Sequence, residues 1–424
     1  MKEAPWSDSK TLAHPDKEER LSKEILQFEK YISPTKSEEA DRIQMQEMFE
    51  DFVAATFPGM KAVPFGSHST GLCLPGSDMD LDLRGDYGSS KTIINRMKKA
   101  LLQQRICSYN DLNHVPFAKV PVLTINAERY PIPVDITANN PSPSSDRTIF
   151  WVKKHQSLRP LYLVLKHSLL ALQHPRPNFR PMSSKFSGMA SYTLVCLIVH
   201  FLEVEAEKQG CDSSSPSYYA NLLVEFLSFY ATFDFAKKGI QFFEKSPYFS
   251  KGSHPPMMIL DPDVPGSNVG RSSAYVNELQ ECFAFLLDTI VERTDDGPRN
   301  SILQRIIPVS NQEPIDGTRR LESRNYEIEP IYMPHSESWE EVQTARREKA
   351  SQRMDRRHGK KNTQDDDHNK RKRWGGDDDD DDDDVYLAQL ESGKKNSNKR
   401  KRRNDDDHSS GYKSLSGKNS HRRW

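Results

Sequence analysis

The chain has 424 residues, 35% of them hydrophobic, with 60 Lys or Arg against 61 Asp or Glu. At about 150 residues per domain, this length allows two domains and a tail. The near-neutral charge does not suit a protein that binds nucleic acid over a broad surface. The chain also lacks the run of roughly 20 apolar residues needed to span a bilayer. Its five scattered cysteines, without a C-x-x-C pair, argue against a zinc site or disulfide framework, so we expect a soluble protein of a reducing compartment.

The charge is distributed unevenly along the chain. From residue 336 onward there are 23 basic and 20 acidic residues, whereas the preceding part holds 37 basic and 41 acidic residues. Binding of RNA is therefore expected to be local to a groove, or to be helped by the tail or by a partner.

The first 150 residues predict a mixed α/β unit. Residues 1–20 are expected to form a flexible arm, and residues 21–150 a catalytic domain with lead-in helices and a small sheet covered by helices on one side. Helical periodicity predicts helices over 21–32, from a cap at Thr35 or Ser37 to Pro58-Gly59, and over 91–104. Strands are expected at 63–65, around Asp80, and over 120–125 and 132–136.

From Pro160 the pattern changes to long helices, predicted at 161–173, 190–207, 218–233 and 277–293. Residues 151–310 thus predict a helical second domain, with the active cleft between the two domains. Residues 311–424 form a low-complexity charged tail, with one helix at 339–354, an acidic run at 377–384 and a basic run at 394–403. So charged a segment is expected to be disordered. Its basic run suits a nuclear localisation signal, an RNA contact or a merely solvated charge cluster.

The most informative stretch is PFGSHSTGLCLPGSDMDLDL, which joins Gly66-Ser67 to Asp78 and Asp80. Alternate residues of a strand share a face, so the two aspartates can reach one metal site while Met79 and Leu81 face the core. A helix beginning after the Gly-Ser turn would direct free N–H groups at a phosphate. The alternative is a polar edge strand with solvated carboxylates.

A third carboxylate is expected at Asp135, a lone acid between Val134 and Ile136 in an apolar strand. Burying it is costly unless it is paired or binds a cation, although backbone hydrogen bonds alone would also satisfy it. Three such oxygen ligands favour Mg²⁺, with Mn²⁺ as a substitute.

Two further positions suit a nucleotide. Lys166 lies within the apolar run LYLVLKHSLLAL, where a triphosphate would explain its charge, as would a lysine that reaches the surface. Ser191 and Tyr192 begin the next helix, where a hydroxyl can meet a phosphate and a ring can stack on a base. A plain helix cap and a core aromatic residue fit the spacing equally well.

These motifs resemble the DNA polymerase β-like nucleotidyltransferase superfamily, in its poly(A) polymerase and terminal uridylyltransferase branch. FGSHSTGLCLPGSDMDLDL resembles the superfamily signature, and IPVDIT resembles the strand of its third aspartate. MILDPDVPGSNVGRSS resembles the nucleotide-recognition loop of the PAP-associated domain, and KEILQFEKYISPTKSEE the lead-in helix of TRAMP-type nuclear surveillance polymerases. The resemblance covers about residues 21–293.

The resemblance implies roles for nine residues. Metal ligation and catalysis would fall to Asp78, Asp80 and Asp135, and nucleotide binding to Gly66, Ser67, Asn140, Lys166, Ser191 and Tyr192. Leu170 stands where family members often have a second basic residue. Ser187-Gly188 replaces the usual Gly-Gly. Uridylyltransferases usually have a histidine where this chain has Ser267, which favours ATP over UTP.

The expected fold is thus α+β, a small mixed-sheet nucleotidyltransferase domain packed against a mainly helical PAP-associated domain. The expected function is template-independent addition of AMP from ATP to RNA 3′ ends by two metal ions, in nuclear RNA polyadenylation, quality control and decay. The resemblance implies a zinc-knuckle RNA-binding protein and an RNA helicase as partners, no membrane association, and a nucleoplasmic or nucleolar location. The alternatives are a uridylyltransferase of the same fold and a catalytically silent scaffold.

Overall fold

The computed structural model describes residues 4–118, 120–243, 246–252, 255–292, 300–309 and 328–334. The predicted tail helix at 339–354, the acidic run at 377–384 and the basic run at 394–403 lie outside the described residues. The predictions made for most of residues 311–424 therefore remain predictions. An exception is the segment 328–334, which contributes a short strand to the folded part.

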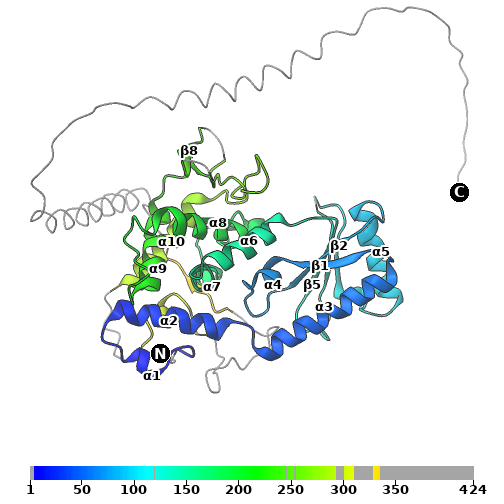
Figure 1. The fold of residues 1–424 in the computed structure, drawn as a ribbon, viewed down its shortest axis with the longest axis horizontal. Coiled ribbons are helices and arrows are strands. Elements are labelled where there is room, and N and C mark those ends of the chain that lie inside the picture. Colours follow the sequence, from blue (N-terminus) through cyan, green and yellow to red (C-terminus); the bar gives the residue numbers. More distant parts are fainter. Residues whose placement is uncertain are drawn as a thin grey trace, which may run out of the picture. The chain divides into compact units, whose positions relative to one another are not determined.

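A five-stranded mixed sheet is the centre of the N-terminal half (Figure 1). Its order is β1-β2-β5-β4-β3, with β2 and β5 parallel and the other neighbours antiparallel. The strands are β1 Lys61–Phe65, β2 Met79–Arg84, β3 Leu112–Val115, β4 Val122–Ile125 and β5 Val134–Ala138. The parallel pair lies at positions two and three of the order, so its residues have neighbours on both sides.

Helices α3 (Lys36–Thr56) and α5 (Ser90–Gln103) supply the apolar side chains that cover one face of this sheet. Thr35 caps the start of helix α3. Its hydroxyl accepts the N–H of Glu38, and the Glu38 carboxylate accepts the N–H of Thr35. The shared core is fully buried at Phe49, Val53, Met79, Leu81, Leu83, Ile93, Met97, Leu101, Leu123, Ile125, Val134 and Ile136. The predicted α+β class, with helices on one side of a small mixed sheet, is confirmed.

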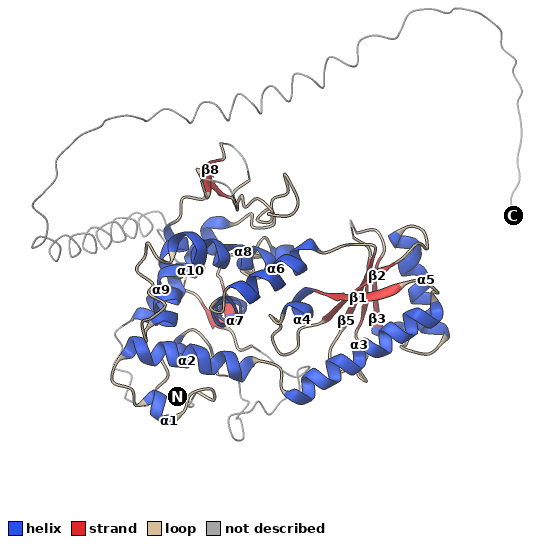
Figure 2. Cartoon of the chain, in the orientation of Figure 1, coloured by secondary structure: helices blue, strands red, loops and turns tan. Residues whose placement is uncertain are grey.

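The second half of the described chain is mainly helical (Figure 2). Its longer helices are α6 Pro143–Lys154, α7 Leu158–Ala171, α8 Ser191–His200, α9 Tyr218–Thr232 and α10 Val276–Val291, and a π-helical turn Phe201–Glu205 continues α8. Two small sheets accompany them, made of β6 (Leu172–Gln173) with β9 (Ile331–Tyr332) and of β7 (Lys238–Ile240) with β8 (Tyr248–Ser250). No described helix is long and apolar enough to cross a bilayer.

The N-terminal segment packs differently from the expectation. Helix α2 (Lys17–Ile32) was assigned to the catalytic domain, but its apolar face lies in the core of the helical half, beside α7 and α9 (Figure 1). Residues 4–20 are also not a loose arm. They contain α1 (Ser9–Leu12), and Trp6 is buried edge-on against Phe28 with a centroid distance of 5.2 Å. A single tryptophan buries enough apolar area to anchor such a segment.

Candidate active site

Four strands carry polar residues in one row across the uncovered face of the sheet. Strand pairing places Asp80 of β2 beside Asp135 of β5, Asp135 beside Thr124 of β4, and Thr124 beside Asn113 of β3. The flanking residues of β2 and β5 point into the core, so the aspartates face away from it. The fold thus brings together two carboxylates that lie 55 positions apart in the sequence.

Asp78, directly before β2, completes a group of three interacting acids. Burial, followed by the charges of Asp78 and Asp135, raises the pKa of Asp80 to about 7. Burial also raises the pKa of Asp135, and a hydrogen bond from Thr124 opposes this effect. The three carboxylates thus form a half-buried group of oxygen atoms on the uncovered face of the sheet.

Asp82 lies on the same strand face but is fully engaged by its own partners. Its carboxylate accepts hydrogen bonds from Thr137 Oγ1 at 3.1 Å, from the N–H of Asn140 at 3.0 Å and from Arg84 Nε at 2.9 Å. Asp82 thereby holds the connection that follows β5. Asn140, predicted to contact the nucleotide, contributes its backbone N–H here, and it is not among the residues that line the pocket described next.

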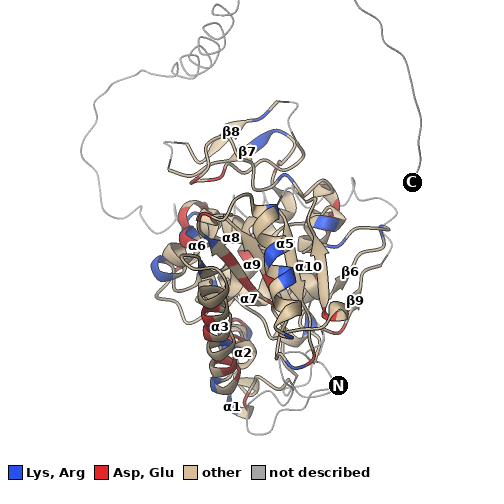
Figure 3. Cartoon of the chain, turned by 90° about the vertical axis from the view of Figure 1, so that its right-hand side faces the viewer, with Lys and Arg blue, Asp and Glu red and all other residues tan. Residues whose placement is uncertain are grey.

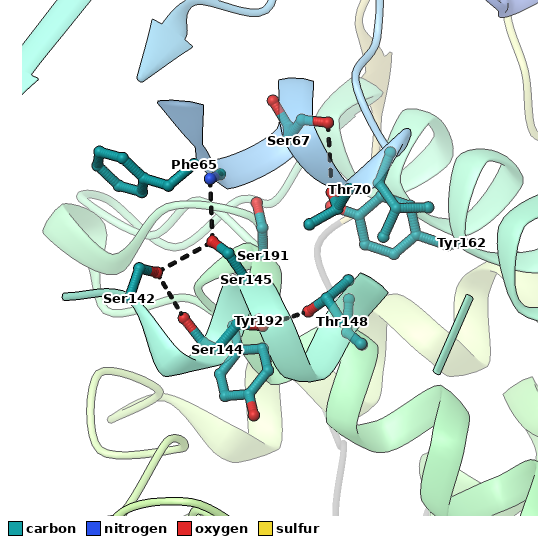
Figure 4. Close-up of a pocket in the computed structure, with 13 residues that line it drawn as sticks. Phe65, Ser67, Thr70, Ser142, Ser144, Ser145, Thr148, Tyr162, Ser191 and Tyr192 are labelled. Carbon is teal, nitrogen blue, oxygen red and sulfur yellow. Dashed lines mark hydrogen bonds between the residues drawn. The ribbon is translucent and has the colours of Figure 1, made fainter. Parts of the chain in front are cut away.

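A pocket of about 220 Å³ adjoins the Gly-Ser turn (Figure 4). Four predicted nucleotide-binding residues line it together with a wall of hydroxyl groups; the lining comprises Phe65, Gly66, Ser67, Thr70, Leu72, Ser142, Ser144, Ser145, Thr148, Tyr162, Ser191, Tyr192 and Val195. A helix was expected to begin after this turn. The structure instead begins the short helix α4 (Gly66–Thr70) at Gly66 itself, so that Gly66 and Ser67 form its first turn.

The hydroxyls of Ser142, Ser144, Ser145 and Thr148, which come from α6 and the residue before it, are missing from the sequence-based prediction. Ser145 Oγ accepts the N–H of Gly66 at 3.0 Å and so ties α6 to the Gly-Ser turn (Figure 4). A hydroxyl-rich run directly after the Asp135 strand is the signal that could have indicated them.

Lys166 and Tyr192 reach the site from the helical half. Lys166 of α7 lowers the pKa of Asp80 through its charge, so its ammonium lies near the carboxylates, and its Nζ is 5.4 Å from the centre of the Tyr162 ring. Tyr192 stacks on Trp151 with a centroid distance of 6.3 Å. Burial raises the pKa of the Tyr192 phenol, which therefore stays protonated and neutral.

The loop between β8 and α10 borders the same region. Burial is the main cause of the raised pKa of Tyr192, and the charges of Asp261 and Asp263 contribute to it. These two loop residues therefore lie near the Tyr192 ring. The loop is shaped by Asn268, whose side chain accepts the N–H groups of Ile259 and Gly270 and donates to the carbonyl of Met257. Arg147 of α6 forms a bidentate ion pair with Asp263, which sequence reasoning did not predict.

The residues present fit a divalent cation. One buried oxygen of Asp135, Oδ1, has no hydrogen-bond partner among the described residues. Burial and the charges of Asp78 and Asp135 also raise the pKa of Asp80, which a bound cation would lower. Within the described ranges, no three His, Cys, Asp or Glu side chains are arranged so that they could hold a metal ion together. An incomplete oxygen set suits Mg²⁺, which keeps several waters and uses substrate phosphates as ligands.

Comparisons with known proteins agree with this fold. Residues 21–144 match the family model of the central palm domain of mitochondrial-like poly(A) RNA polymerase. Poly(A) RNA polymerase cid14 of Schizosaccharomyces pombe is 28% identical over 64% of this chain and 40% of its own length. An inactive non-canonical poly(A) RNA polymerase protein, Trf4-2 of Drosophila melanogaster, is 28% identical over 68% of this chain and 73% of its own.

A solved structure of the polymerase core of TRAMP, an RNA surveillance complex, superimposes with a TM-score of 0.63 at 23% identity, over 73% of this chain and 100% of that one. At 23% identity, this structural similarity establishes that the two chains share a fold, and no more than that. The described chain therefore has the fold of that polymerase core, a mixed-sheet domain with a helical domain attached. In sequence it is similar to non-canonical poly(A) RNA polymerases, and it spans about two fifths of the length of cid14.

Proposed function

We propose that this chain is a template-independent polynucleotide adenylyltransferase that adds AMP from ATP to RNA 3′ ends and releases pyrophosphate. The observation that carries the proposal is the pairing of Asp80 with Asp135, next to Asp78 and a hydroxyl-lined pocket. Because the chain spans two fifths of the cid14 polymerase and a relative of similar identity is named inactive, its activity requires a direct assay.

In this proposal Asp78, Asp80 and Asp135 hold two divalent ions, Mg²⁺ or Mn²⁺. When bound, the ions would activate the RNA 3′-hydroxyl and stabilise the leaving pyrophosphate. Gly66 and Ser67 present the start of α4 to the triphosphate, and Ser191 and Lys166 add a hydroxyl and a positive charge. The face of Tyr192 stacks on the base. These residues contribute positioning and charge neutralisation, without a covalent intermediate on the protein.

We infer ATP as the preferred nucleotide from Ser267, which stands where uridylyltransferases usually have a histidine. The acidic body of the chain supports dependence on a zinc-knuckle RNA-binding protein and an RNA helicase for capture of RNA. The basic run at 394–403 and the similarity to the TRAMP polymerase core support a nuclear role in RNA surveillance and decay.

The test is an extension assay with the purified chain, a labelled RNA, Mg²⁺ and each nucleoside triphosphate in turn. Extension with ATP and little with UTP is expected; preference for UTP would replace the adenylyltransferase with a uridylyltransferase. The double variant Asp78→Ala/Asp80→Ala should lose extension while retaining its fold. Asp86→Ala, an exposed acid just after β2, is the matched control and should keep full activity.

A second arm of the assay addresses dependence on partners. Weak extension by the isolated chain, raised when a zinc-knuckle protein is added, supports the dependence. Vigorous extension by the chain alone would contradict it. No extension with any nucleotide by the folded wild-type chain, at any metal concentration and with the partner present, would leave the silent scaffold as the better reading.

A further inference from the structure

A basic and aromatic strip follows the free edge of the catalytic sheet. Residues 89–118, from the start of α5 to just past β3, contain five Lys or Arg and a single acid, Asp111, whereas the first 335 residues carry a net negative charge. The Asp111 carboxylate accepts the N–H of Ser108 at 2.7 Å and is thus engaged with its own backbone. Figure 3 shows the Lys and Arg segments of α5 in blue.

Two aromatic rings in this strip are held in the open. Tyr109, just before β3, is 70% exposed, and Phe117, just after it, is 85% exposed. The Nζ atom of Lys98 lies 4.9 Å from the centre of the Tyr109 ring, and that of Lys91 lies 4.1 Å from the centre of the Phe117 ring. We call Lys91, Lys98, Tyr109 and Phe117 the β3-edge surface.

Rings this exposed gain little from the hydrophobic effect, because most of their area stays in water. Their arrangement is nevertheless regular. Lys91 and Lys98 are seven residues apart on α5 and so lie on one side of the helix, and each covers a ring at one end of β3. Alternating cations and open aromatic faces are the pattern that proteins use to bind single-stranded nucleic acid.

The strip lies at the β3 edge on the side of α5, and the carboxylates lie two or three strands inward on the other face of the sheet. Asn113 of β3 is in register with Thr124 and, through it, with Asp135. Two strand spacings of about 4.8 Å place Asn113 roughly 10 Å from Asp135, and Tyr109 and Phe117 lie four residues to either side of Asn113, about 13 Å along an extended strand. At about 3.4 Å per stacked nucleotide, the two rings are therefore roughly five nucleotides from Asp135.

We propose that the β3-edge surface binds the single-stranded RNA immediately upstream of the 3′ end, with bases stacked on Tyr109 and Phe117. The direction of the RNA rests on the proposed function, which places the 3′-hydroxyl at Asp135. The lysines contact phosphates, because their flexible stems move from a ring to a neighbouring phosphate when a base takes that place. Single strands are favoured over duplexes, whose bases are not free to stack on a ring.

The first test is RNA affinity of the full chain, measured by fluorescence anisotropy with a labelled single-stranded RNA and no nucleotide. Tyr109→Ala and Phe117→Ala should each raise the Kd at least fivefold, and the double variant at least twentyfold. Tyr109→Phe keeps the ring and should bind like wild type. Tyr332→Ala removes an aromatic residue that is 76% exposed in β9 and is the matched control. A double variant within twofold of wild type overturns the proposal.

The second test separates this surface from the basic tail. The double variant Lys91→Gln/Lys98→Gln should lower the slope of log affinity against log salt by about 1.4. An RNA with a photoreactive base about five nucleotides from its 3′ end should crosslink to the segment containing residues 109–117. Crosslinking confined to other segments would overturn the proposal.

The outcomes distinguish this inference from the proposed function. Wild-type chain that binds RNA through Tyr109 and Phe117 but adds no nucleotide would leave the surface intact and remove the activity. Full extension activity and unchanged RNA affinity in the Tyr109→Ala/Phe117→Ala variant would support the proposed adenylyltransferase activity and rule out RNA binding at the β3-edge surface.

Discussion

The backbone of Gly66 lies directly against the carboxylate of Asp80. A Cβ atom placed on Gly66 would be 2.1 Å from Asp80 Oδ2, and the Gly66 φ angle of +68° is itself in the region that favours glycine. The turn predicted to bind phosphate and the carboxylate predicted to bind metal therefore share one contact. Neither can be altered without moving the other.

Replacing Gly66 by alanine should cut extension activity at least a hundredfold, because the added methyl group displaces the Asp80 carboxylate. Gly71→Ala is the matched control: its φ is +71°, so the backbone strain of about 1–2 kcal/mol is the same, but a Cβ there meets no atom within 4 Å. Kinetic assays and thermal unfolding of both variants check this. Equal losses of activity would show that strain, and not the contact with Asp80, matters.

Replacing Asp80 by asparagine should change how stability depends on pH in the metal-free protein. The folded-state pKa of about 7 lies above the ordinary value of 3.8, so the folded state binds the extra proton between these pH values. Its free energy of unfolding therefore falls as pH rises from about 4 to about 7, and stays low above that. Asp80→Asn removes this penalty and should be more stable than wild type at pH 8.

The measurement is urea unfolding in the presence of a chelator at pH 5 and pH 8. The gain of Asp80→Asn over wild type should be larger at pH 8 than at pH 5. Adding Mg²⁺ at pH 8 should stabilise the wild type and have much less effect on the variant. A gain that is the same at both pH values would contradict the predicted burial and crowding of this carboxylate.

The ion pair between Arg147 and Asp263 should couple α6 to the loop that borders Tyr192. Both side chains are about a quarter exposed, at 24% and 22%, so we expect a coupling free energy of about 1 kcal/mol in a double-mutant cycle of Arg147→Ala and Asp263→Ala. Either variant should raise the KM for ATP several-fold with a smaller effect on kcat. Additive effects on unfolding would show that the pair does not couple the two elements.

The buried Glu24 should be among the most sensitive positions for stability. Its carboxylate accepts hydrogen bonds from Arg20 Nε at 3.1 Å, from Ser301 Oγ at 2.6 Å and from the N–H groups of Ile302 at 3.2 Å and Leu303 at 2.7 Å. Glu24→Gln leaves Arg20 without its counter-charge and should cost about 3 kcal/mol.

Urea unfolding of Glu24→Gln checks this expectation. Glu39→Gln, at an exposed position on α3, is the control and should lie within about 0.5 kcal/mol of wild type. A small effect at Glu24 would mean that the attachment of α2 to residues 301–303 contributes little to the fold.

The expectation that the three aspartates lie close together rests on local signals, and the structure brings them together. Asp78 and Asp80 stand two apart at the start of an alternating run that also holds Asp82, and Asp135 is the only acid in its strand. Period-two alternation then fixes which face each occupies. The pairing of Asp80 with Asp135, by contrast, depends on strand order, which alternation does not encode.

The elements that sequence reasoning missed have weak or misleading local signals. Helix α6 follows Pro141 and contains Pro143 and several serines, a composition typical of turns. Proline is accepted in the first turn of a helix, where its missing N–H has no partner to lose. Strand β3 reads LNHV, without an apolar alternation. The amphipathic face of α2 was evident, but periodicity does not reveal which neighbour covers such a face.

The packing of α2 ties the two halves of the described chain together. Helix α2 lies in the helical core, whereas α3, which follows it after residues 33–35, lies in the core of the sheet. Leu72 and Leu74, which lie between α4 and β2, also pack in the helical core. The helical core is thus assembled from segments that precede, interrupt and follow the sheet domain, so a truncation at any single position between them would remove part of that core.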